Sequence, residues 1–270
     1  MSAGDKPTGT LTYDSSWTHN AITEAAIAFD EGSGTPAMHE GSGTPEFNAT
    51  QVEWNTTGDG DLGIRNVASP TVSAFSVPFG TMAVAAGAIM VIYDLNSVDT
   101  TNIATLFTED TTNETFCYRK SGVTNSQLEA GNIANSYAGG EAHFETTGYH
   151  VLVTAWTTDD PLDAGVDVCN VYDNGSEVTG SPVAGGIGGL AGTSPLNLLS
   201  NGVDADWFAD ATILGVVIFN DYLTPAQVAT LSADEWGWLS SGGPVITDVD
   251  TDEAWTDGDT GLIATGTDFY

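Results

Sequence analysis

The sequence predicts an all-β fold, and three observations support that prediction. The chain of 270 residues contains 32 Gly and 10 Pro, a composition typical of many tight turns between short strands. Asp outnumbers Glu by 24 to 13, and Asp favours turns whereas Glu favours helices. Hydrophobic residues make up 41% of the chain, which is enough apolar mass for a packed core and excludes a disordered acidic tail.

The N-terminal part is polar and contains a short duplication. Residues 1 to about 20 are predicted to form an arm or a first strand. The motif GSGTP at residues 32–36 then recurs at residues 41–45, and two copies are too few for a solenoid. A pair of similar turns in an exposed loop is the simpler interpretation, and a ligand-binding loop near His39 and Glu40 is the alternative.

Strand-like stretches recur at short intervals from Val52 onward. In His150–Trp156 apolar residues dominate both faces, which is typical of a central sandwich strand. The predicted strands are Thr71–Phe79, Ala83–Asp94, Ile103–Thr108, Thr115–Arg119, Ala142–Thr146, His150–Trp156, Asp167–Asp173 and Ile213–Phe219.

Two local signals mark a hairpin and a helix. Asn174-Gly175 follows a predicted strand and is typical of a tight hairpin turn with positive φ angles. Thr224 is placed to cap a helix, with Pro at the first helical position and Gln227 completing a capping box. This helix is predicted to run from about 224 to about 236.

The order of these predicted strands, the hairpin and the helix resembles that of the laminin-G-like, concanavalin A-like jelly-roll domain. Three segments carry the resemblance: YHVLVT at 149–154, VYDNGSEV at 171–178 and ATILGVVIFNDYLTPAQV at 211–228. The resemblance is best over about 140–240. It implies a packing role for His150, which occupies a strand position of the family. Asn174 and Gln227 depart from the family pattern, but both keep its turn and capping chemistry. The resemblance implies a β-sandwich of two antiparallel sheets over residues 21–240.

Beyond that domain, residues 241–270 are predicted to be a linker and an incomplete immunoglobulin-like segment. PVITDV at 244–249 and GTDF at 266–269 are similar to the opening of a TIG module. Only some 27 residues follow the linker, which is too few for the usual sandwich of that module. Either the natural chain continues past Tyr270, or these strands complete their sheet on a neighbouring chain.

The charge balance excludes several classes of partner. Four Lys and Arg stand against 37 Asp and Glu, giving a formal net charge of −33. So few cations cannot neutralise a run of phosphates or hold an anionic membrane surface, so nucleic-acid binding is not expected. No segment reaches the about 18 consecutive apolar residues of a membrane span, so we expect no membrane insertion.

Candidate ligand contacts lie in loops. The loops 32–48 and 201–210 are the expected contact surface at the sandwich rim, with His39, Glu40 and Trp207 as candidate ligand-binding residues. Calcium, which prefers oxygen ligands, is the candidate metal for an acidic cluster, although solvated turns are the simpler interpretation. That cluster consists of Asp204, Asp206 and Asp210.

No catalytic pattern stands out. The E-x-D-x-x-E arrangement of laminarinase-like relatives is absent from the sequence, and so is a Gly-x-Ser-x-Gly nucleophile elbow. Cys117 and Cys169 either form one disulfide or remain reduced, and the reduced state is favoured. We therefore expect no enzymatic activity.

The resemblance implies a structural or adhesive role at a bacteriophage virion surface, in a head decoration or fibre protein or a tail-fibre module. The expected partners are other virion proteins and a host surface glycan, and the expected assembly is a homo-oligomer, with a trimer favoured for a fibre. A secreted carbohydrate-binding adhesin of a marine or halophilic microbe, at the cell surface or outside the cell, is the alternative. A glycoside hydrolase comes third.

Overall fold

The all-β prediction is confirmed by the computed structural model. It describes residues 6–67, 75–78, 86–97, 104–108, 116–121, 125–130, 136–139, 146–158, 168–178, 195–199 and 210–241. For residues 104–105, 116–121, 125–130, 136–139 and 169 only the backbone is described. The expected linker and Ig-like segment at 241–270 lies outside these ranges apart from Ser241.

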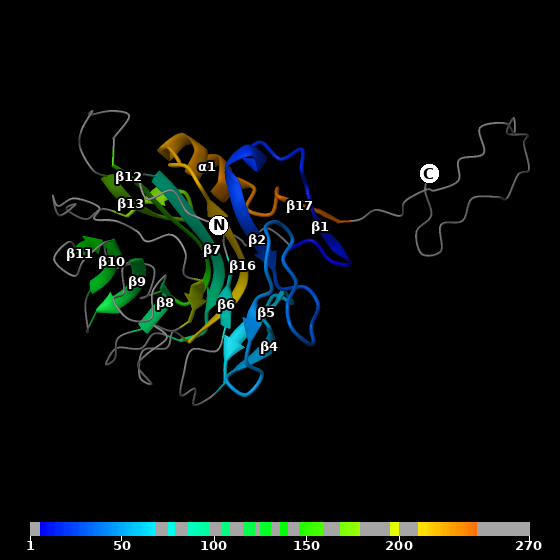
Figure 1. The fold of residues 1–270 in the computed structure, drawn as a ribbon. Helices are drawn as coiled ribbons and strands as arrows, with labels where there is room; N and C mark the ends of the chain where they lie inside the picture. Colours follow the sequence, from blue (N-terminus) through cyan, green and yellow to red (C-terminus); the bar gives the residue numbers. More distant parts are fainter. Residues whose placement is uncertain are drawn as a thin grey trace, which may run out of the picture.

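Two antiparallel sheets form a sandwich (Figure 1). The first has the strand order β11 (Ser136–Gly139), β10 (Asn125–Ala130), β9 (Phe116–Ser121), β8 (Ala104–Thr108), β15 (Leu196–Leu198), β6 (Phe75–Val77) and β3 (Glu46–Phe47). The second has the order β14 (Ser176–Glu177), β13 (Val168–Asp173), β12 (Gly148–Thr157), β7 (Ala86–Leu95), β16 (Ala211–Phe219), β5 (Leu62–Asn66) and β4 (Val52–Thr56), with β2 (Thr23–Ala28) also paired to β16.

The main core fills the space between the two sheets. It includes Trp156 of β12 and Tyr93 of β7 from one sheet, and Phe75 and Phe107 from the other, all buried almost completely. The side chains alternate along a strand, so every second residue of β7 from Ile89 to Leu95 enters this core, whereas in β16 the alternation is interrupted between Ile213 and Val216. Burial of these large aromatic side chains is the main force holding the sandwich together.

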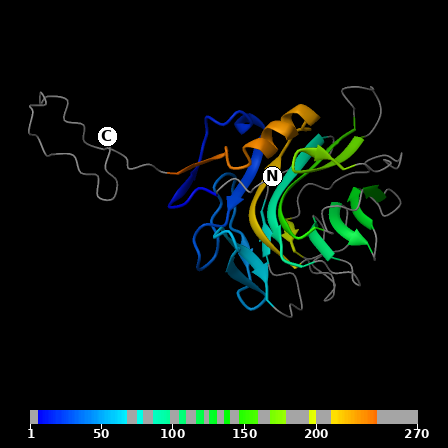
Figure 2. The same cartoon turned by 180° about the vertical axis from the view of Figure 1, so that it is seen from behind.

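A second core covers the outer face of the eight-stranded sheet. Here α1 (Pro225–Ala233) and a two-stranded ribbon of β1 (Leu11–Tyr13) and β17 (Leu239–Ser241) form a third layer. Figure 2 shows this layer on the side of the sheet that faces away from β8–β11. Trp236, Trp238, Leu231 and Val228 pack here against the outer residues of the sheet. Both faces of β16 are therefore buried, as its nearly continuous apolar sequence indicates.

The helix starts where the sequence predicts and ends earlier. The Thr224 side chain and Gln227 form the expected capping box. The helix stops at Ala233, however, and Asp234–Gly237 form a turn closed by the Gly237 N–H, which donates to the Asp234 carbonyl over 3.1 Å. This turn brings Trp236 and Trp238 into the outer core, and a continued helix would place them differently.

Most predicted strands are present, with shifted ends, but several other strands of the structure were not predicted. The Asn174-Gly175 turn has φ angles of 49° and 77°, as its hairpin type requires. The predicted strand Ala142–Thr146 lies almost entirely outside the described residues. The strands outside the predicted ranges are β2, β3, β4, β5, β10, β11, β15 and β17. Strand β2 is rich in Ala, which intrinsically favours helix, and it becomes a strand because Ala25 to Ala28 pack into both cores.

The GSGTP duplication forms two similar exposed turns. Gly32, Gly34, Gly41 and Gly43 all have positive φ angles, which only glycine adopts without strain. In each copy the first four residues are exposed and the proline is buried. The simpler interpretation of the repeat, a pair of turns, therefore describes its backbone.

Candidate functional site

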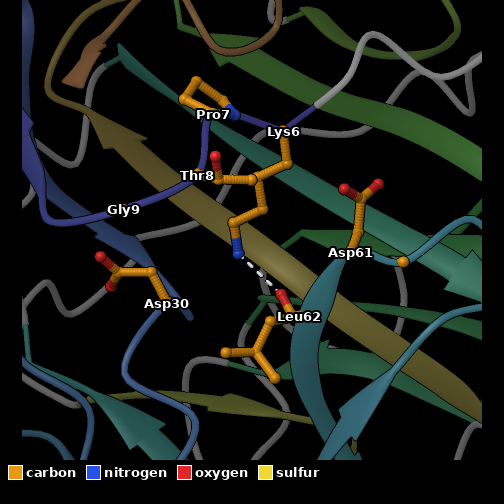
Figure 3. A pocket seen from close by; sticks show the side chains of 8 residues that line it. Lys6, Pro7, Thr8, Gly9, Asp30, Asp61 and Leu62 are labelled. Carbon is orange, nitrogen blue, oxygen red and sulfur yellow. Dashed lines mark hydrogen bonds between the residues drawn. The ribbon is translucent and has the colours of Figure 1, made fainter. Parts of the chain in front are cut away.

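A small pocket lies beside the turn between β4 and β5. It is lined by the N-terminal segment 6–9, Asp30 just after β2, and residues 60–62 at the start of β5 (Figure 3). Its volume is about 180 Å³, below the roughly 300–1,000 Å³ of typical small-molecule sites. A pocket of this size suits an ion or one small polar group.

The side chain of Lys6 is the central feature of this pocket. Lys6 is buried, and its Nζ donates to the backbone carbonyl oxygens of Phe29 at 2.7 Å, Leu62 at 2.7 Å and Leu214 at 3.1 Å. Nζ also lies 5.4 Å from the ring centroid of Trp236. An ammonium group has three N–H donors, so these three carbonyls satisfy all of them.

Carboxylates surround this buried cation. Burial lowers the pKa of Lys6 to about 8, while attraction to Asp30, Asp61 and Glu31 opposes that effect. Because this pKa lies above neutrality, the ammonium keeps its charge at pH 7. Asp30 and Asp61 line the pocket on either side of the lysine stem (Figure 3). The pocket is thus a cation site whose cation comes from the chain itself.

His39, predicted to bind a ligand, is placed behind this pocket. Its Nδ1 accepts the Ala28 N–H at 3.2 Å, so Nε2 carries the proton and lies 3.6 Å from Asp30 Oδ1. Its side chain is only 6% exposed, and burial lowers its pKa. The structure therefore places His39 as a support for Asp30, and a direct ligand contact by His39 stays a prediction.

Glu40 joins the same loop to the edge of β2. Its N–H donates to the Ala26 carbonyl at 3.1 Å, and its own carbonyl accepts the Ala26 N–H at 3.2 Å. The Glu40 residue is half-buried. Its ligand-binding role stays a prediction as well.

The predicted calcium cluster is only partly described. Asp210 is exposed and closes the end of the β7–β16 pair: its carboxylate accepts the Ser97 hydroxyl and, at 3.3 Å, the Asn96 side-chain amide. Within the described ranges, no three His, Cys, Asp or Glu residues gather as metal ligands. Three of the residues predicted to bind a ligand or a metal lie outside the described ranges: Asp204, Asp206 and Trp207.

His150 is buried among partners, in line with a packing role. Its Nδ1 lies 3.0 Å from Asp173 Oδ1, its Nε2 lies 2.8 Å from the Thr146 carbonyl, and its ring stacks on Tyr93. Burial alone lowers its pKa, but the hydrogen bonds to Asp173 and Thr146 outweigh that effect and raise it. The ring therefore ties β12 to β13 and carries a proton more readily than a free histidine.

Sequence reasoning missed a half-buried aromatic residue at the rim. Trp54 of the edge strand β4 packs on Phe47 at 6.1 Å between ring centroids, and its Nε1 donates to the Gly34 carbonyl at 3.0 Å. It thereby fastens the first GSGTP turn to the sandwich. The sequence signal that could have indicated this residue is the tryptophan within the polar strand VEWNT. A large aromatic side chain on an edge strand remains partly accessible.

Two other sequence predictions concern the cysteines and membrane spans. Cys117 lies on β9 of one sheet and Cys169 on β13 of the other, and the state of their thiols stays a prediction because their side chains are not described. The helices within the described residues are all too short or too polar to cross a membrane.

Comparisons with known proteins identify the fold. No family model and no curated protein matches the sequence. Among solved structures, a sialidase of Trypanosoma rangeli matches with a TM-score of 0.56 and 10% identity over 80% of this chain and 33% of its own. The binding domain of botulinum neurotoxin DC, solved with rat synaptotagmin II, matches with a TM-score of 0.56 and 10% identity. This match covers 80% of this chain and 52% of the neurotoxin chain.

A third match is domain 4 of AbnA, an extracellular arabinanase from Geobacillus stearothermophilus, in complex with arabinotriose. Its TM-score is 0.50 at 15% identity, over 78% of this chain and 98% of that domain. This chain spans only a third of the sialidase and half of the neurotoxin chain. At these identities the matches show the fold alone, a concanavalin A-like β-sandwich distantly similar to lectin and sialidase-type domains.

Proposed function

We propose that this protein is a non-enzymatic glycan-binding module at the surface of a bacteriophage virion, in a head or tail fibre or decoration protein. The observation that carries the binding part is the match to a complete sandwich domain solved with arabinotriose, which this chain covers over 98% of its length. A further match comes from a study of botulinum neurotoxin type C whose cell entry depends on two ganglioside molecules. The arabinanase match shows that one sandwich domain of this fold binds a sugar in another protein.

The contact surface that we propose is the first GSGTP turn together with Trp54. Residues 32–35 are exposed and offer backbone groups and two hydroxyls for hydrogen bonds. The Trp54 ring beneath them supplies an apolar surface, and an amphipathic aromatic is a common anchor at binding interfaces. The hydrogen bond from Trp54 to Gly34 keeps the turn in place, which lowers the entropic cost of binding.

The charge of the domain favours neutral glycans over anionic ones. Among the described side chains the cationic groups are Lys6, which is buried and bound to three carbonyls, and Arg65, which pairs with Glu53 at 2.7 Å. The net charge of −33 repels sialylated or sulfated sugars, and this repulsion weakens as salt is added.

The binding test uses the full chain on immobilised neutral arabino-oligosaccharides and matched sialylated oligosaccharides, with surface plasmon resonance as the readout. We expect binding to at least one neutral glycan and a loss of about tenfold or more in Trp54→Ala, as for a central aromatic anchor. Trp17→Ala is the matched control, because Trp17 is also half-buried but packs against Phe219 at the other end of β16. Equal losses in both variants, or no neutral glycan bound, would overturn this proposal.

The virion part has its own test. Antibodies against the chain should label purified phage particles in immunogold electron microscopy, at the head or the tail. Chain found only in the culture medium or on cells, with unlabelled particles, would refute the virion assignment and favour a secreted adhesin.

A further inference from the structure

The eight-stranded sheet is irregular at Leu214, in the middle of β16. One edge of β16 pairs with β5 at Thr212 and Ile213, and then with β2 from Gly215 to Phe219. On its other edge the register to β7 shifts between Ile213 and Gly215. The partner of β16 therefore changes at Leu214.

Three backbone carbonyls converge at this change of partner. They belong to Leu214, to Phe29 just after β2 and to Leu62 at the start of β5, so each of the three strands contributes one oxygen. The Leu214 oxygen also accepts the Phe29 N–H at 3.2 Å. Buried carbonyl groups require a donor or a cation, and here a cation from residue 6 supplies the contact.

Two carboxylates border the same point. Asp30 and Asp61 line the pocket of about 180 Å³ around the Lys6 side chain (Figure 3). Asp30 is held in place by the Leu11 N–H, which donates to its Oδ2 at 3.3 Å, and by His39 Nε2, which lies 3.6 Å from its Oδ1. A cluster of acidic residues alone would not make a site, but here a cation already occupies a cradle of three oxygens.

We propose that this cradle is a divalent-cation site that Lys6 fills from within the chain. Without the lysine it would bind Ca²⁺ through the carbonyl oxygens of Phe29, Leu62 and Leu214 and the carboxylates of Asp30 and Asp61. We call these five groups the switch-point site. It does not include the acidic cluster at 204–210, and it does not depend on glycan binding.

The chemistry of the oxygens selects Ca²⁺ among divalent ions. Ca²⁺ takes six to eight oxygens in flexible geometry at about 2.3–2.6 Å and accepts backbone carbonyls as readily as carboxylates. The ammonium–oxygen distances of 2.7–3.1 Å require only a small inward movement of the carbonyls to reach that range. The side chains of Asp30 and Asp61, which line the pocket, would have to turn toward the ion. Mg²⁺ demands near-ideal octahedral geometry at about 2.0–2.1 Å and loses its water reluctantly, so it should bind more weakly.

The test is Ca²⁺ binding by the full-length Lys6→Met variant, compared with the Arg65→Met variant. Both substitutions remove one positive charge, so general attraction of Ca²⁺ to the acidic surface rises equally in both. We expect Lys6→Met to bind one Ca²⁺ in isothermal titration calorimetry, with a Kd on the order of 10⁻⁴–10⁻³ M. At 10 mM Ca²⁺ its melting temperature should rise by about 4 °C or more above that of the metal-free variant. The wild-type and Arg65→Met proteins should show neither effect.

A second variant assigns the binding to this site. Adding Asp61→Asn to Lys6→Met should weaken Ca²⁺ binding at least tenfold, because it removes one of the two carboxylates. If Lys6→Met unfolds without metal and refolds with Ca²⁺, that outcome supports the proposal. Three results would overturn it: a folded Lys6→Met without Ca²⁺ binding, a variant that stays unfolded at every Ca²⁺ concentration, and equal Ca²⁺ binding in Lys6→Met and Arg65→Met.

Discussion

Replacing Lys6 by Met, in the absence of metal, measures what the buried ammonium contributes to the fold. The substitution keeps most of the side-chain length and removes the charge and all three donors. The carbonyls of Phe29 and Leu62 lose the ammonium, whereas that of Leu214 keeps the Phe29 N–H. Three separate parts of the chain therefore lose their common contact at once.

The size of the effect follows from two opposing contributions. Hydrogen bonds to a charged donor are worth about 1.5–3 kcal/mol each, and a buried carbonyl left without a donor costs about 1–3 kcal/mol. Burial lowers the pKa of Lys6 from 10.5 to about 8, and at about 1.4 kcal/mol per pKa unit the variant escapes a cost of roughly 3 kcal/mol. We expect a net loss of about 2–4 kcal/mol in the free energy of unfolding, or about 5–15 °C in melting temperature.

Urea unfolding followed by tryptophan fluorescence provides the assay, with the midpoint and the slope both compared with the wild type. Arg65→Met is the control, because the pair of Arg65 with Glu53 is about half exposed and should contribute less than about 1 kcal/mol. If Lys6→Met is destabilised no more than Arg65→Met, the ammonium does not hold these strands together and the reasoning is wrong.

Two further predictions address the packing and the pH dependence of the domain. Gly87→Ala should cost about 3 kcal/mol by thermal unfolding, because its added Cβ would collide with the ring of Trp156 in the buried core. Gly58→Ala is the control: its added Cβ has no atom within 4 Å, so stability should change by less than about 0.5 kcal/mol. Similar costs for the two variants would contradict the packing described. The pKa of His150 is raised in the folded state. The resulting stability is fully present below the unfolded pKa of 6.5 and is lost as the pH rises through the folded pKa. Asp173→Asn should therefore lower the urea midpoint more at pH 5.5 than at pH 8.5, and an equal loss at both pH values would count against this ion pair.

Much of the fold could be predicted from the sequence because its signals are local. The apolar run Ile213–Phe219 indicates a strand buried on both faces, and β16 is such a strand. Thr224 with Gln227 forms the helix cap, and Asn174-Gly175 forms the hairpin turn. In each case neighbours along the chain supply the required hydrogen bonds or φ angles, so the sequence alone suffices.

The residues behind the pocket and at the proposed contact surface could not be predicted in this way. His39 was chosen from a loop of glycines and faces inward, behind Asp30, since loop composition does not determine which way a side chain points. Trp54 was overlooked because only the edge position of β4 leaves its ring partly accessible. The direction of the His39 side chain and the exposure of the Trp54 ring both depend on which strands lie next to one another.

By itself, then, the sequence determined the all-β class, the strand and helix signals and the excess of acidic over basic residues. Only the tertiary structure decided the role of Lys6, which belongs to a polar segment predicted to form an N-terminal arm or a first strand. Its three partners lie 23, 56 and 208 residues away, and they come together only when β16 exchanges β5 for β2. A buried charge is stabilised by oxygens that the folded backbone brings near, and no pattern of neighbouring residues records their position.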